Sequence, residues 1–101
     1  MGRLLYGSPP VAFELDDRTL AHVEIVIIAK LRRNESFGFS IAGKADARTT
    51  IWLNPASDVQ FEYGKGSQDV NRAWLELLIE AANSPQGLRV LPEPAPEKPA
   101  A

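Results

Sequence analysis

Hydrophobic and polar residues follow two different periods along this chain, and the periods divide it into strands and helices. Several runs alternate with a period of two or are short and apolar, and turn residues bound them, as is typical of strands. These runs are residues 3–6, 11–15, 36–41, 49–53, 59–63 and 88–91. Gly7-Ser8-Pro9-Pro10 is a turn between the first two runs, so we expect an opening hairpin there. The three runs between residues 36 and 63 have short links and predict an antiparallel meander.

The stretch from Asp16 to Arg33 predicts one helix that crosses the core. Its apolar stripe at helical spacing is Leu20, Val23, Ile27 and Leu31. Asp16 or Asp17 can cap the first turn, basic residues complement the dipole at the other end, and Asn34 tolerates the left-handed conformation that closes many helices. The β-branched run from Val23 to Ile28 would also suit a buried strand, but the caps and the length favour the helix.

A second helix is expected from a cap at Ser67 or Asp69 to about Asn83. Its apolar positions follow the i, i+3, i+4, i+7 pattern. They are Val70, Ala73, Trp74, Leu77, Leu78 and Ala81. Ser84-Pro85-Gln86-Gly87 ends this helix before the last strand.

Together the elements predict an α+β fold: an antiparallel sheet of five or six strands with two helices, in the order β-β-α-β-β-β-α-β. Residues 1–91 are expected to form a single domain, because 101 residues with 45% hydrophobic content suffice for one modest core. Residues 92–101 are rich in Pro, Ala and Glu and predict a disordered tail.

Composition narrows the function classes. The chain has no cysteine, which removes disulfides, thiolate metal sites and thiol nucleophiles. Its longest apolar run, Ile25 to Ala29, is far too short to span a membrane, and no signal peptide is visible, so we expect a soluble cytoplasmic protein without a membrane partner. A formal charge of −2 gives no global attraction to nucleic acid, so such binding would need a local basic patch.

Several strings distributed over nearly the whole chain carry a resemblance. They are MGRLLY at residues 1–6, DDRTLAH at 16–22, AKLRRNESF at 29–37, IWLNP at 51–55, NRAW at 71–74, ANSP at 82–85 and GLR at 87–89. In these strings the chain resembles a family of small uncharacterised actinobacterial proteins that often carry the label "ATP-dependent DNA ligase". The resemblance implies a domain of unknown function with no established activity, cofactor or catalytic residue. Members often have His where Asn54 stands, and a longer link around Gly43 to Arg48.

The ligase label can be compared with the residues. True ligases start nucleotidyl transfer with a lysine nucleophile in a K-x-D-G setting, and Lys44-Ala45-Asp46-Ala47 lacks the glycine. No further set of carboxylates and lysines that would hold metal and triphosphate is apparent. A solvated turn between two strands is the favoured interpretation of this segment.

Two other residues are candidates for chemistry. His22 is the only histidine, so a histidine metal cluster or triad cannot form within one chain, and its position off the apolar stripe predicts a surface or interface side chain. Glu24 lies beside the apolar arc, and the favoured interpretation pairs it with a nearby Arg or Lys rather than making it a site with a shifted pKa. We therefore predict no catalytic residue, no metal site and no cofactor.

A basic patch is the first candidate binding surface. Lys30, Arg32 and Arg33, joined by Arg72 or Arg89, could bind nucleic acid, with Tyr6, Trp52 or Tyr63 available for stacking. Cations at the end of a helix also complement its dipole without any ligand.

An exposed apolar surface is the second candidate. Alternation puts Trp52 opposite Ile51 and Leu53, and together with Ile25 on the broad apolar helix it predicts a partner-binding surface or a homodimer. The expected function is a small non-enzymatic protein-binding or self-associating accessory module, with nucleic-acid binding second and nucleotidyl transfer a distant third.

Overall fold

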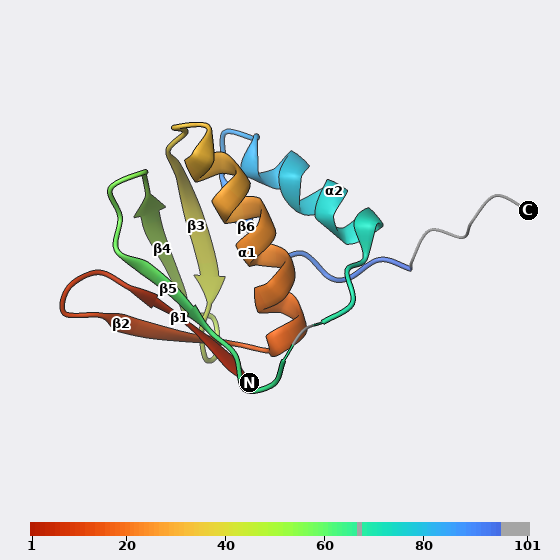
Figure 1. Ribbon diagram of the computed structural model, residues 1–101, viewed down its shortest axis with the longest axis horizontal. Coiled ribbons are helices and arrows are strands. Elements are labelled where there is room, and N and C mark those ends of the chain that lie inside the picture. Colours follow the sequence, from red (N-terminus) through yellow and green to blue (C-terminus); the bar gives the residue numbers. More distant parts are fainter. Residues whose placement is uncertain (67, 96–101) are drawn as a thin grey trace, which may run out of the picture.

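The expected order of elements is confirmed (Figure 1). The computed structural model describes residues 1–66 and 68–95. The strands are β1 (Gly2–Tyr6), β2 (Val11–Leu15), β3 (Phe37–Ala42), β4 (Arg48–Leu53), β5 (Val59–Glu62) and β6 (Leu88–Arg89), and the helices are α1 (Asp17–Arg32) and α2 (Arg72–Ala82). Ser67 and most of the predicted tail, residues 96–101, lie outside the described residues. No helix within the described ranges is long and apolar enough to cross a membrane.

The strands form two sheets rather than the single sheet predicted from the sequence. One sheet has the order β2-β1-β5 and the other the order β4-β3-β6. The predicted meander is wrong, because β5 leaves β4 and pairs with β1, and the last strand runs parallel to β3. In this arrangement β1 is paired on both edges, and Leu4 is aligned with Phe13 on one side and with Phe61 on the other. Alternation determines which face of a strand is apolar, but it does not determine the neighbouring strand.

Helix α1 has the caps that its sequence predicts. The Asp16 carboxylate accepts hydrogen bonds from the backbone N–H groups of Arg18 and Thr19 at 2.9 and 3.0 Å. At the other end Asn34 has φ 61°, its N–H donates to the carbonyl of residue 31, and the next N–H donates to that of residue 30, which is a Schellman motif. The strand interpretation of residues 23–28 is therefore wrong. Ile25 remains 41% exposed, so one side of this broad apolar helix is uncovered.

Helix α2 begins later than expected. Asn71, rather than Ser67 or Asp69, is its N-cap, and its side-chain oxygen accepts from the N–H groups of residues 73 and 74. Val70 precedes the helix and is 54% exposed, whereas Trp74 is buried as predicted.

The core lies between the helices and one face of each sheet. Its fully buried side chains include Leu20, Val23 and Ile27 from α1, Phe39 from β3, Leu53 from β4, Leu78 from α2 and Leu88 from β6. Along β3 the buried positions alternate with residues 38, 40 and 42, which face the other way. Among the described residues, no helix lies on that second face of the β4-β3-β6 sheet (Figure 1).

Candidate functional site

The uncovered face of the β4-β3-β6 sheet is the candidate site, and we call it the open face. It consists of Gly38, Ser40, Ala42, Arg48, Thr50, Trp52 and Arg89. The register explains why these residues share a face, since Ser40 is aligned with Thr50 on one side and with Arg89 on the other. The residues of the central strand on this face have small side chains. They form a shallow floor, which the longer side chains of the two flanking strands border.

Two neighbouring hollows lie along this floor, and we call them together the trough. One, of about 920 Å³, is lined by Ser40, Arg48 and Arg89 among others, and the second, of about 510 Å³, is lined by Gly38 and Trp52. Thr50 and Gln86 border both hollows. The open face thus carries two adjacent hollows, one lined by Trp52 and the other by Arg48.

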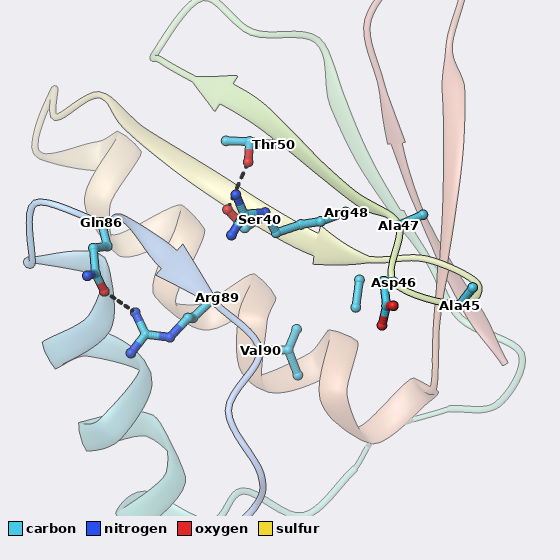
Figure 2. A pocket seen from close by; sticks show the side chains of 10 residues that line it. Ser40, Ala45, Asp46, Ala47, Arg48, Thr50, Gln86, Arg89 and Val90 are labelled. Atoms are coloured by element: carbon cyan, nitrogen blue, oxygen red, sulfur yellow. Dashed lines mark hydrogen bonds between the residues drawn. The ribbon is translucent and has the colours of Figure 1, made fainter.

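The arginines of the trough are available to a ligand. Figure 2 shows the side chain of Arg48 extending back over β3 toward Ser40 and that of Arg89 extending toward Gln86, to which its Nη1 donates at 3.1 Å. Among the described residues neither guanidinium forms an ion pair, although Asp46 lines the same hollow. Arginine donors of this kind suit the oxygens of phosphate or carboxylate groups.

The backbone of Trp52 forms a hydrogen bond to the other sheet, and its side chain is exposed. Its carbonyl oxygen accepts a hydrogen bond from the hydroxyl of Tyr6, which ties β4 to the other sheet. Its side chain points away from the core, and the residue is 58% exposed. The alternation along β4 put Trp52 on the face opposite Ile51 and Leu53, and in this fold its side chain is exposed.

The basic residues predicted from the sequence do not converge. Lys30 is only 12% exposed, and its Nζ donates to Glu35 at 3.0 Å and to Asn83 at 2.8 Å. Arg32 and Arg33 are exposed just beyond it, and Arg33 also pairs with Glu35, at 3.2 Å.

Arg72 lies away from these three residues. It is the first residue of α2, about 16 Å along that helix from Asn83, which contacts Lys30. Arg89, the alternative member of the patch, lies on the open face.

The two predicted partner-binding residues lie on different surfaces. Ile25 is on the exposed side of α1, where it lines a separate hollow of about 420 Å³ together with Tyr63 and Val70. Beside it the Tyr63 hydroxyl donates to Glu24, which therefore pairs with a phenol instead of the expected Arg or Lys. Burial, followed by the hydrogen bond and charge of Glu24, raises the pKa of Tyr63 well above its usual value.

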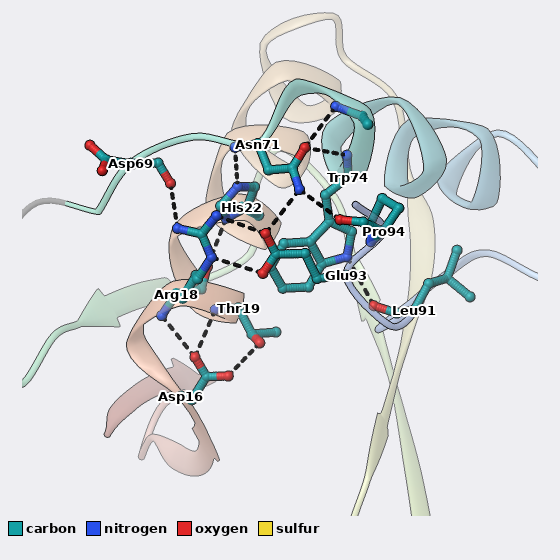
Figure 3. Close-up of polar contacts among 11 residues, drawn as sticks. Asp16, Arg18, Thr19, His22, Asp69, Asn71, Trp74, Leu91, Glu93 and Pro94 are labelled. Carbon is teal, nitrogen blue, oxygen red and sulfur yellow. Dashed lines mark hydrogen bonds and ion pairs between the residues drawn. The ribbon is translucent and has the colours of Figure 1, made fainter. Parts of the chain in front are cut away.

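His22 is completely buried, so the prediction of a surface histidine is wrong. Its Nδ1 donates to the carbonyl of Arg18 at 2.8 Å, its Nε2 accepts from the N–H of Asn71 at 2.8 Å, and its ring centroid is 4.6 Å from that of Trp74 (Figure 3). Helical spacing placed His22 off the stripe of α1, but the start of α2 packs over that side. Both ring nitrogens are engaged, which makes this histidine a link between the helices.

Next to His22, the segment after β6 is held by an ion pair. Arg18 donates from Nε and Nη2 to the two carboxylate oxygens of Glu93 at 2.8 and 2.7 Å, and from Nη1 to the carbonyl of Asp69 at 2.8 Å. The hydrogen bonds from Arg18, with help from Asn71, lower the pKa of Glu93 to about 2. Residues 92–95 thus begin the predicted tail but make contacts with the domain.

Asn71 completes this polar cluster. Its side-chain amide donates to Glu93 at 2.9 Å and to the carbonyl of Pro94 at 3.0 Å, and the indole of Trp74 donates to the carbonyl of Leu91 at 2.9 Å. The sequence gives no sign of this cluster, because its members are far apart in the chain. Its groups satisfy one another, so we interpret it as structural.

Within the ranges 1–66 and 68–95, no group of three or more His, Asp or Glu side chains could hold a metal ion.

The comparisons with known proteins identify the family. No curated protein and no solved structure matches the chain. A family model matches residues 1–93, a range that includes Glu93. The chain therefore belongs to the family described as a domain of unknown function, DUF7882.

Proposed function

We propose that the protein is a small non-enzymatic accessory protein of the cytoplasm that holds a macromolecular partner on its open face. The observation that carries this proposal is Trp52, whose large side chain is 58% exposed on a sheet face that otherwise has a small-residue floor. Exposed tryptophans next to shallow hollows are frequent anchors for partners.

A partner protein is the first candidate. Trp52 would be its central anchor, and Val90, which is 38% exposed and lines the far hollow, adds apolar surface. Two copies meeting through this face would bring Arg48 and Arg89 of each copy together, which opposes a homodimer in that geometry. The exposed apolar residues around Ile25 support self-association through the helix side instead.

Nucleic acid is the second candidate, and the arginines of the open face favour it. Arg48 and Arg89 lie in one trough with Trp52, whereas Lys30 is already paired with Glu35. The basic surface that supports this candidate is thus the open face rather than the end of α1.

Nucleotidyl transfer, suggested by the ligase label of the resembling actinobacterial proteins, has the least support. Lys44 lies in a tight turn. The N–H of Gly43 donates to the carbonyl of Ala47 at 2.8 Å, and the N–H of Ala47 donates to the carbonyl of Lys44 at 3.1 Å. The neighbouring hollow is lined by residues 45–48 and not by Lys44, so this hollow gives no support to a nucleophilic role for the lysine.

The proposal is tested with two matched variants, Trp52→Ser and Ile25→Ser, each of which removes one exposed apolar side chain. Sedimentation velocity over a range of concentrations measures self-association, and affinity capture from cell extract measures retained protein and nucleic acid. We expect capture of a partner by the wild type to be lost in Trp52→Ser and kept in Ile25→Ser, whereas any self-association should be lost in Ile25→Ser and kept in Trp52→Ser. The opposite pattern, or a monomer that retains nothing, would contradict the proposal.

A further inference from the structure

We propose that the partner of the open face is single-stranded nucleic acid, with a base stacked on Trp52 and phosphates held by Arg89 and Arg48. This inference rests on the proposed function and specifies its ligand. It is carried by three features of the trough: its charge, the spacing of its groups and the exposure of the Trp52 ring.

The charge of the trough differs in sign from that of the chain. Its lining has three basic side chains, Arg48, Arg89 and Lys30, and two acidic ones, Asp46 and Glu35, whereas the whole chain has a formal charge of −2. Lys30 and Glu35 pair with each other at 3.0 Å, so the two arginines set against Asp46 leave an excess of one positive charge in the hollow that they line. An anionic ligand therefore finds its favourable contacts here although the molecule as a whole repels it.

The strand registers determine the order of the groups. Trp52, Arg89 and Arg48 are aligned with residues 38, 40 and 42 of β3 in turn. Successive levels are thus two residues, or about 6.7 Å, apart along the strand. An extended polynucleotide offers one base and one phosphate per nucleotide, a repeat of the same order, so a short segment could contact all three levels.

The surroundings of Trp52 favour bases over an apolar peptide anchor. On the level of Arg89, between those of Trp52 and Arg48, lie the hydroxyls of Ser40 and Thr50, hydrogen bonded to each other at 2.9 Å, and the amide of Gln86 borders both hollows. These polar groups can bond to sugars and base edges, whereas the buried core of a protein interface is mostly apolar. Stacking requires an unstacked base, which single strands supply and duplexes do not.

The experiment is a fluorescence-anisotropy titration of the full chain into labelled single-stranded DNA and RNA of about 12 nucleotides, within the site sizes of single-strand binders. Trp52→Ala should weaken binding by about 5- to 150-fold, the equivalent of losing one stacked base. Arg48→Ala/Arg89→Ala should weaken binding to all sequences alike and lower the salt slope by about 1.4, the value for two phosphate contacts with a single strand.

Matched controls locate the site. Arg32→Ala/Arg33→Ala removes the same charge from the end of α1, and Trp52→Phe keeps a stacking ring, so both should bind nearly as the wild type does. Because Trp74 is buried, any quenching of tryptophan fluorescence on binding should come from Trp52 and disappear in Trp52→Phe. Circular dichroism confirms that each variant is folded.

Four outcomes would overturn the inference. These are absence of binding at low salt, equal binding of duplex DNA, a greater loss in the Arg32/Arg33 variant than in the Arg48/Arg89 variant, or tighter binding of a poly-glutamate peptide with the same arginine dependence. If oligonucleotides fail to bind but partner capture still depends on Trp52, only this inference fails. If capture is also independent of Trp52, the proposed function fails with it.

Discussion

Replacing His22 tests the claim that a buried imidazole joins the two helices. His22→Ala removes the acceptor of the Asn71 N–H, which is itself buried, and an unsatisfied buried donor costs about 1–3 kcal/mol. It also removes a ring pair with Trp74, worth about 0.5–1.5 kcal/mol, and leaves a cavity where a fully buried ring stood. We expect a total loss of about 3–5 kcal/mol in the free energy of unfolding, which is a large part of the stability of a domain this size.

His22→Phe separates the two contributions. It keeps a ring against Trp74 but accepts no hydrogen bond, so we expect a loss of about 1–3 kcal/mol. Urea unfolding followed by far-ultraviolet circular dichroism measures both variants, and the midpoint of His22→Ala should fall by about 1 M or more with an unchanged slope. A loss below about 1 kcal/mol in His22→Ala would refute the reasoning, as would equal losses in the two variants.

Three further predictions concern Glu93 after β6, the turn before β6 and the N-cap of α1. Because its bonds to Arg18 hold the pKa of Glu93 at about 2, below its ordinary 4.5, the stabilisation from this carboxylate should be present above pH 4.5 and be lost as the pH falls toward 2. Thermal midpoints measured across that range should therefore depend less on pH in Glu93→Gln, and an unchanged profile would contradict this. Gly87→Ala should cost about 1–3 kcal/mol in urea unfolding, because φ is 80° and the added Cβ would lie 2.6 Å from the carbonyl oxygen of Gly38; a neutral result would contradict this turn geometry. Asp16→Ala should cost about 1 kcal/mol by loss of the α1 cap, and a midpoint equal to that of the wild type would exclude that role.

Much of the fold could be predicted because its signals are local. The cap at Asp16 and the left-handed residue Asn34 act within one helical turn, and the alternation at Phe37 to Ile41 describes the two faces of one strand. The start of α2 was predicted too early, because Asp69 and Asn71 are both good caps and the choice depended on contacts of Asn71 with His22 and Glu93.

The candidate site could be predicted only in part. Alternation found that Trp52 lies on the face opposite the core side of β4. It could not show that Arg89 would stand across β3 from it, since that depends on a parallel pairing between strands far apart in the chain. Lys30 was predicted to join a basic patch, but Glu35 and Asn83, the latter from the end of α2, take up its donors.

By itself the sequence determined the elements, their order, and the apolar face of each strand and helix, because these follow from spacing and caps within a few residues. Only the tertiary structure decided that β5 pairs with β1, that β6 pairs with β3, that α2 covers His22, and that one face of the β4-β3-β6 sheet stays open. The physical reason is that hydrophobic burial and strand pairing are satisfied by many combinations of partners. The choice among them depends on how all the elements pack together.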